Sequence, residues 1–229
     1  MKRRVISLVA ILLVALNILN VDAFAGTSNV YHKIESSDKK IALTFDDGPH
    51  PRITPEILEI LNEYGIKATF FVIGQNVVNY PETMKLVIES GCEIGNHTYS
   101  HKNFKNLGVS EIQDEFERCR QTLLDNFLVD PTLVRPPQGI CTEDLCNVSE
   151  QMNYDIILWS IDTKDWAHTS AEDISRNILA NAKSGDIILM HDYVSGKVGT
   201  CDALRIIIPE LINRGFEFVT VGELIKNQA

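Results

Sequence analysis

The stretch IALTFDDGP at residues 41–49 decides the fold of this chain. It is a short apolar run, rich in residues that favour strands, and it ends in two carboxylates and a Gly-Pro turn. The same arrangement, an apolar run followed at once by polar residues, recurs along the chain. The further runs are residues 68–73, 93–95, 133–135, 156–161, 187–190 and 216–221. The pattern predicts about seven strands.

Amphipathic patterns typical of helices lie between these runs, at residues 55–64, 81–90, 110–128, 142–153, 171–182 and 203–214. Strands that alternate with helices pair in parallel, because each crossover needs a helix's length of chain. The polar residues would then lie at the carboxyl ends of the strands. A barrel brings these ends onto one face, whereas an open sheet spreads them along a line. We therefore expect an α/β fold, a distorted (β/α) barrel in a single domain at residues 39–229.

The amino terminus has the features of a signal peptide. A basic start, at residues 2–4, precedes an apolar run at residues 5–16, and small residues follow at Ala23 and Ala25. The apolar run is short for a membrane span of about 20 residues, although a retained anchor is the alternative. We expect a signal peptide at residues 1–25, a lead-in at residues 26–38, and a secreted or cell-surface protein without stable membrane insertion after cleavage.

The charge and cysteine content exclude several classes of protein. The chain has 21 basic and 31 acidic side chains, a net charge of −10, which argues against nucleic acid as a partner. Its five cysteines show no spacing typical of a zinc-thiolate site. An odd number leaves at least one thiol unpaired, so the disulfide pattern stays open. We expect a monomer.

Two histidines four residues apart, His97 and His101 in the motif HTYSH, follow one of the predicted strands. Such a pair alone often has a purely structural role. Together with Asp47, however, it makes a set of one carboxylate and two imidazoles, the ligands of many catalytic zinc sites that keep an open position. The three residues therefore predict a metal site.

Three further motifs lie at predicted strand ends. RPPQG at residues 135–139 is a rigid turn that can present a backbone N–H, DTKDW at residues 162–166 places acids beside a tryptophan, and LMH at residues 189–191 ends in a histidine suited to proton transfer. Each motif also has a structural interpretation: a plain turn, a packed tryptophan and a structural histidine.

Taken in order, TFDDGP, HTYSH, RPPQG, DTKDW and LMH resemble the polysaccharide deacetylase family, the carbohydrate esterases that share the NodB homology domain. The resemblance spans about residues 38–226. It implies a distorted barrel with a groove over its carboxyl-terminal face. It also implies that Asp47, His97 and His101 hold a divalent metal, zinc first, with cobalt or nickel as alternatives.

The same resemblance implies roles for the other motif residues. Asp46 would be the general base, oriented and tuned by Arg135. His191 would protonate the leaving amine, and Asp165 would orient that histidine. The implied substrate-binding residues are Pro137, Gln138, Trp166 and Leu189, with the backbone N–H of Gln138 facing the oxyanion. Gln138 is a departure, since many members carry an aromatic residue there.

The activity implied is hydrolysis of N-acetyl groups on the amino sugars of a cell-wall polysaccharide. Peptidoglycan N-acetylglucosamine is the first candidate and chitin-type oligomers are the second. Two alternatives stay open: an O-acetyl esterase acting on a xylan-type polysaccharide, and a carbohydrate-binding relative without catalytic activity.

Overall fold

Parallel strands form one curled sheet in the computed structural model, which describes residues 29–35, 38–193 and 199–227. The order across the sheet is β1-β6-β5-β4-β3-β2-β8-β7, and β9 pairs with the start of β2. The strands are β1 (Val30–Tyr31), β2 (Lys40–Asp46), β3 (Thr69–Val72), β4 (Glu93–Asn96), β5 (Leu133–Val134), β6 (Asp155–Ile157), β7 (Ile161–Asp162), β8 (Ile187–His191) and β9 (Glu217–Phe218). All the strand pairs are parallel.

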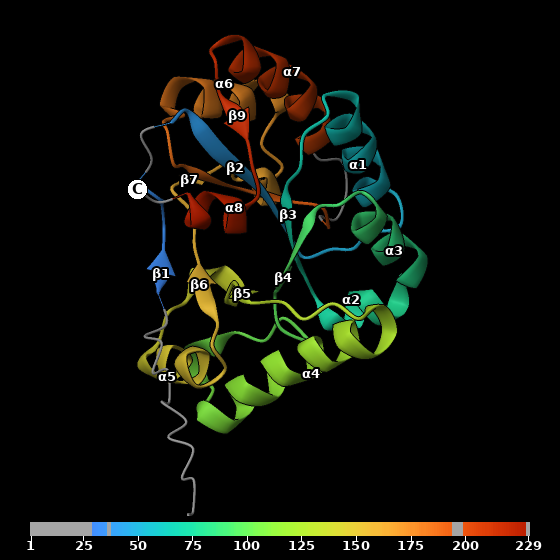
Figure 1. The fold of residues 1–229 in the computed structure, drawn as a ribbon, viewed down its shortest axis with the longest axis vertical. Helices are drawn as coiled ribbons and strands as arrows, with labels where there is room; N and C mark the ends of the chain where they lie inside the picture. Colours follow the sequence, from blue (N-terminus) through green and yellow to red (C-terminus); the bar gives the residue numbers. More distant parts are fainter. Residues whose placement is uncertain (1–28, 36–37, 194–198, 228–229) are drawn as a thin grey trace, which may run out of the picture.

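Helices surround the curled sheet, with α6 and α7 side by side at the top of Figure 1, α1 and α3 on the right, and α4 below. They are α1 (Ile53–Glu63), α2 (Gly74–Asn79), α3 (Pro81–Glu89), α4 (Val109–Phe127), α5 (Glu143–Gln151), α6 (Ala171–Asn181), α7 (Thr200–Asn213) and α8 (Val221–Lys226). Three short 3₁₀ turns are η1 (Phe104–Asn106), η2 (Pro137–Gly139) and η3 (Asp165–Ala167).

The predicted α/β class and distorted barrel are confirmed, and the structure adds detail. Among the described residues β1 and β7 stand at the two ends of the sheet without pairing to each other, so the barrel is an open half-barrel. The apolar run at residues 156–161 is two strands, β6 and β7, and not one. Strand β1 falls in the expected lead-in, where Val30 and Tyr31 pair with β6. Short helices α2 and α8 were not predicted.

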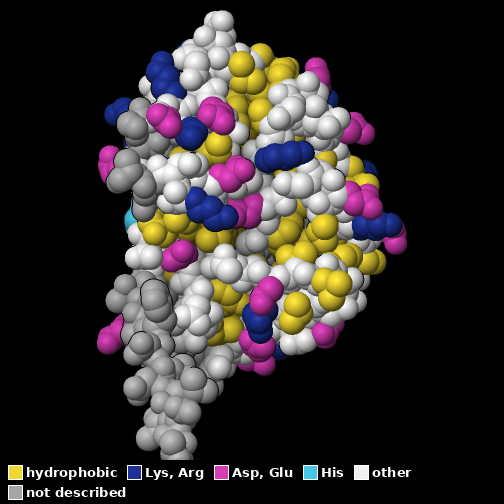
Figure 2. Space-filling model, viewed as in Figure 1, with side chains coloured by type: hydrophobic (Ala, Val, Ile, Leu, Met, Phe, Trp, Pro, Cys, Tyr) yellow, Lys and Arg dark blue, Asp and Glu magenta, His cyan; other side chains and the backbone are white. Residues whose placement is uncertain are grey.

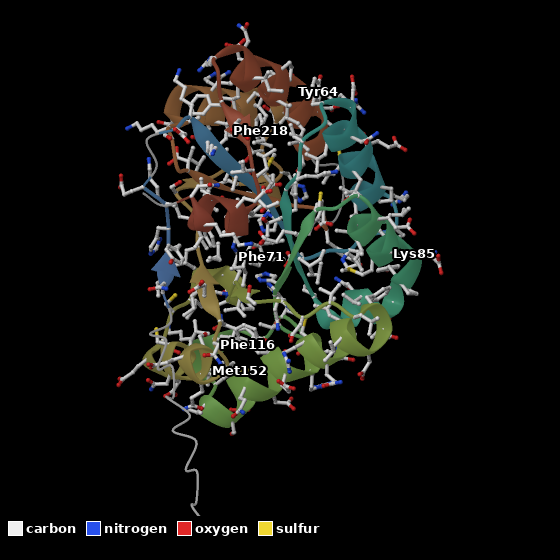
Figure 3. All side chains as sticks on the ribbon, in the orientation of Figure 1. Tyr64, Phe71, Lys85, Phe116, Met152 and Phe218 are labelled. Atoms are coloured by element: carbon white, nitrogen blue, oxygen red, sulfur yellow. The ribbon has the colours of Figure 1, made fainter. Side chains whose placement is uncertain are left out.

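Apolar side chains pack on both faces of the sheet. The larger core cluster lies between the sheet and its helices, with Ile57, Leu204 and Ile207 fully buried in it. A second cluster fills the inside of the curl around Phe71, which Figure 3 shows at the centre of the molecule. Full burial of each such side chain contributes about 1.5–3 kcal/mol. The curl is therefore held from both sides.

Helix α8 closes the amino ends of the strands. Thr220 caps it, and the backbone N–H groups of Val221 and Gly222 donate to Thr69 Oγ1 and Glu93 Oε2, both at 2.9 Å. Thr69 and Glu93 are the first residues of β3 and β4. Because the strands are parallel, their carboxyl ends and the polar residues there meet at the end of the sheet opposite α8.

The surface visible in Figure 2 carries acidic and basic side chains in a mixed pattern, without a broad patch of one sign. Within the described ranges no helix has the length and apolar character needed to cross a bilayer. The expected signal peptide at residues 1–25 lies outside the described residues.

Candidate active site

Asp47, His97 and His101 come together at the carboxyl ends of β2 and β4. Their ligand atoms all lie within 4.8 Å of one another. Asp47 Oδ1 is 3.4 Å from His97 Nε2 and 3.2 Å from His101 Nε2. The sequence-predicted trio is therefore a real cluster in space.

This cluster fits a divalent cation. Asp47 Oδ1 is buried and has no hydrogen-bond donor among the described residues, which is costly unless a cation satisfies it. His97 is buried, and its Nδ1 lies 2.8 Å from the carbonyl oxygen of Arg135. Since that carbonyl can only accept, Nδ1 carries a proton, and in the neutral ring Nε2 has a lone pair facing Asp47 that can bind a cation.

The backbone around the cluster is held in unusual conformations. Asp47, Thr98, His101 and Gln138 have φ values of 74°, 70°, 57° and 59°, in the left-handed region that non-glycine residues rarely adopt. Side chains fix these turns: Asn76 Nδ2 donates to the Asp47 carbonyl at 2.7 Å, and the His101 N–H donates to Thr98 Oγ1 at 3.0 Å. Strained backbone of this kind is typical of functional sites.

Asp46 faces the same site from beside Asp47, and Arg135 holds it. Arg135 is fully buried, and its Nη1 donates to Asp46 Oδ1 at 2.7 Å and to Thr44 Oγ1 at 2.8 Å. Its other nitrogens donate to the carbonyls of Ile157 and Leu158, both at 3.0 Å. With all these donors satisfied, the guanidinium is a rigid cation that sets the position of the Asp46 carboxylate.

His191 and Asp165 form a second pair. His191 Nδ1 lies 2.8 Å from Asp165 Oδ1, and the His191 backbone N–H donates to Asp165 Oδ2, also at 2.8 Å. Thr200 Oγ1 donates to the same carboxylate. Burial opposes the charged ring, but the hydrogen bond and charge of Asp165 outweigh it and raise the pKa of His191 to about 9. His191 is therefore cationic at neutral pH.

A groove of about 480 Å³ connects Asp46, His191 and the cluster of Asp47, His97 and His101. Of the predicted substrate-binding residues, Gln138, Trp166 and Leu189 line it, and Trp166 is 53% exposed. Pro137, the first residue of η2, is buried and does not belong to the lining. The complete described lining is Asp46, Asp47, His97, His101, Gln138, Trp159, Asp162, Trp166, Leu189 and His191.

Two supporting carboxylates were missed by sequence reasoning. Asp192 is fully buried, accepts from Thr54 Oγ1 at 2.5 Å, and has a pKa raised to about 7 by burial and by Asp47 and Asp46. It packs against Gly48, where a Cβ would meet its carboxylate at 2.1 Å. Its place directly after His191 was noticeable in the sequence, but no pattern indicated its contact with the 48–54 turn.

Glu115 on α4 is the second missed residue, and it fixes the loop that carries His101. Its fully buried side chain accepts from the Ser100 N–H at 2.8 Å and from Ser100 Oγ at 2.7 Å, and it pairs with Lys102 at 3.0 Å. These bonds clasp both sides of His101 to the helix. The helical period places Glu115 on the apolar face of α4 with Ile112 and Cys119, so a charged residue there signals a buried polar partner, but the pattern does not identify Ser100 as that partner.

Replacing Glu115 by alanine is expected to lower both thermal stability and metal affinity, because the partly buried Ser100 N–H loses its acceptor at a cost of about 1–3 kcal/mol. Melting temperature and metal dissociation constant, by competition with a chelator, are the measurements. Lys102→Ala is the matched control, since Lys102 is 50% exposed and both Ser100 bonds remain. Equal metal affinity in Glu115→Ala and wild type would contradict this role.

The fold and the site together define an α/β half-barrel hydrolase with a candidate metal centre at the carboxyl ends of its strands. The polysaccharide deacetylase family model matches residues 33–157, more than half of the chain. The chain belongs to the polysaccharide deacetylase family, as the ordered motifs indicated, and it is an enzyme of the deacetylase class.

Individual relatives agree with this assignment. A peptidoglycan-N-acetylglucosamine deacetylase of Bacillus cereus is 38% identical over 87% of this chain and 94% of its own length. A crystal structure of a peptidoglycan N-acetylglucosamine deacetylase superposes with a TM-score of 0.83 and 35% identity, covering 89% of this chain and 94% of that one. A family 4 acetyl xylan esterase from Clostridium thermocellum, solved with a cobalt ion, has a TM-score of 0.76 and 34% identity over 82% and 91% of the two chains.

Proposed function

We propose that this enzyme hydrolyses the N-acetyl groups of amino sugars in a cell-wall polysaccharide, with peptidoglycan N-acetylglucosamine first and chitin-type oligomers second. The observation that carries the proposal is one groove lined by a carboxylate fixed by Arg135, a metal-type cluster, and a cationic histidine. Amide hydrolysis needs a base for water and an acid for the leaving nitrogen. The similarity to the deacetylase from Bacillus cereus supports this choice of sugar.

The three ligands Asp47, His97 and His101 would hold the divalent metal. Zinc is our first choice because one carboxylate and two imidazoles are a usual catalytic zinc set, and cobalt or nickel would also suit them. When bound, the metal supplies Lewis acidity that activates water and polarises the acetyl carbonyl. The orphaned Asp47 Oδ1 is the contact that supports this use of the cluster.

Asp46 is the proposed general base. Its Oδ1 is occupied by Arg135, and its Oδ2 lies 3.8 Å from His97 Nε2, on the side of the metal ligands. Oδ2 can therefore accept the proton of the attacking water while Arg135 keeps the carboxylate from turning. Arg135 acts here through Asp46 and does not line the groove.

His191 is the proposed general acid. Its Nδ1 is engaged by Asp165, so Nε2 is the atom that can give a proton to the departing sugar nitrogen. Asp165 holds the ring in place and favours its charged form. Loss of that proton to the amine completes cleavage of the C–N bond.

The remaining groove residues would orient the substrate. The backbone N–H of Gln138 has no acceptor within the described part of the chain and can donate to the oxyanion. Leu189 and Trp166 offer apolar surface for the acetyl methyl group and a sugar face. Pro137 would contribute by holding the turn that presents this N–H.

Asp165→Asn is expected to shift the alkaline limb of the pH–rate profile to lower pH. His191 is protonated below its raised pKa of about 9, and activity falls as pH rises through that value. Without the Asp165 charge the pKa moves toward the ordinary histidine value of about 6.5. The profile of kcat from pH 5 to 10 measures this; an unchanged alkaline limb would rule out His191 as the group that titrates.

Acetate release from peptidoglycan and from chitooligosaccharides by the metal-loaded protein tests the proposed function. Release from either substrate is expected. No release from both, with metal bound at one equivalent, would refute it.

O-acetyl esterase activity is the second candidate, favoured by the similarity to the acetyl xylan esterase. The same groove can attack an ester, because the water, base and oxyanion donor are used alike. Comparing kcat/KM on acetylxylan and on chitooligosaccharides separates the two activities.

We also propose that the protein works as a monomer outside the cell or at its surface, after residues 1–25 are removed as a signal peptide. The basic and apolar leader in the sequence supports export, and the cell-wall substrates named for its relatives lie there. The mass of the protein recovered from culture medium tests the cleavage site.

A further inference from the structure

Gln138 is joined to the loop after His101 by one side-chain hydrogen bond. Asn103 Nδ2 donates to Gln138 Oε1 at 2.8 Å. Asn103 lies two residues after His101, and Gln138 stands in the turn after Arg135. The bond therefore connects the loop that carries His101 with the η2 turn, which carries Gln138 on the groove wall.

The orientation of both amides follows from a backbone group. Asn103 is the N-cap of η1, and its Oδ1 accepts from the Lys105 N–H at 2.8 Å. A backbone N–H can only donate, so Asn103 must face it with oxygen and must turn its NH₂ toward Gln138. Gln138 then meets that donor with Oε1. Its own Nε2 is consequently left over.

Gln138 Nε2 has no acceptor among the described residues, and Gln138 is exposed on the groove lining. The carboxylates on the same lining, Asp46, Asp47 and Asp162, offer only acceptors. The amide is thus a neutral donor on a lining that also carries three carboxylates and the cationic donor His191. A substrate group that meets it must carry an acceptor oxygen.

We propose that Gln138 Nε2 is a specificity-determining donor for an oxygen of the sugar chain, a hydroxyl or an acetyl carbonyl, and that Asn103 is the positioning residue that sets its polarity. This inference rests on the proposed function. It also implies discrimination: a sugar that presents an ammonium group at this position meets donor against donor. An already deacetylated sugar is therefore disfavoured there.

Asn103→Asp tests whether Asn103 sets the orientation of the Gln138 amide, and it changes no residue of the groove wall. One carboxylate oxygen still accepts from Lys105 N–H, but the other can no longer donate, so Gln138 must turn its NH₂ toward it and its oxygen toward the groove. With fully acetylated chitotetraose, kcat/KM is expected to fall about three- to tenfold, the range for one hydrogen bond. Selectivity for the fully acetylated tetramer over a partially deacetylated one falls as well.

The added negative charge is controlled in two ways. In a Gln138→Ala background, Asn103→Asp is expected to have no further effect, because the substitution acts only by turning the Gln138 amide. Asn126→Asp, on the exposed surface of α4, adds the same charge elsewhere and is expected to behave as wild type. Metal affinity and melting temperature are measured for each variant and are expected to be unchanged.

The proposal would be overturned if Asn103→Asp kept the wild-type kcat/KM and selectivity. It would also be overturned if Asn103→Asp caused the same loss with and without the Gln138 side chain. Failure of the proposed function has a different signature, since wild type would then release no acetate from any substrate. In that case calorimetric binding of chitotetraose to the same variants still decides the inference. Weaker binding only where Gln138 is present supports it, and equal binding refutes it.

Discussion

Replacing Asp46 by asparagine is expected to lower kcat by about 10²–10⁴, the usual contribution of a general base. Asparagine keeps the shape of the side chain, and its amide oxygen can still accept from Arg135 Nη1, which bonds Asp46 Oδ1 in the wild type. Arg135 is therefore not left buried without a partner. What is lost is the second carboxylate oxygen, the proposed acceptor of the proton of water.

The measurement is steady-state acetate release together with bound metal and melting temperature. Metal content near one equivalent and a small change in melting temperature are expected, because Asp46 is not one of the three clustered ligands. A kcat within threefold of wild type would show that another group is the base.

Replacing His97 or His101 by alanine is expected to remove most metal binding and activity. Each ring is one of the three proposed protein ligands, so the loss of metal affinity should exceed the about 10–100-fold that follows removal of an outer-shell partner. His97→Ala should have the larger effect, because His97 is buried and fixed by the Arg135 carbonyl, whereas His101 is partly exposed.

Metal content after dialysis and the dissociation constant for added zinc are the measurements. His32→Ala serves as the matched control, because His32 is an exposed histidine directly after β1 and outside the groove lining. Full metal content in His97→Ala would contradict the proposed ligand set.

Sequence reasoning predicted the parts of this molecule that depend on local pattern. Apolar runs that end in polar residues located β2, β3, β4 and β8, and the alternation with helices predicted parallel pairing. Because parallel strands share a direction, their carboxyl ends meet. The sequence pattern alone therefore predicts that Asp46, His97 and His191 lie near one another. The family resemblance added roles to positions already singled out.

Features that depend on tertiary contact could not be predicted. Glu115 lies fourteen residues beyond His101, and only the packing of α4 brings it back to the loop. The pairing of Asn103 with Gln138 joins residues 35 apart in the sequence. Short elements such as β1, α2 and α8 carry too few residues for a periodic signal. Strand β1 forms on an edge of the sheet, α8 covers the starts of two strands, and α2 packs against α4.

The most direct test of the central claim is acetate release from chitotetraose and peptidoglycan by the apoprotein, titrated with zinc. The expected result is no release after chelation, a linear return of activity up to one equivalent of zinc, and no return in His97→Ala. Full activity in protein shown to be free of metal would contradict a hydrolytic centre built on Asp47, His97 and His101.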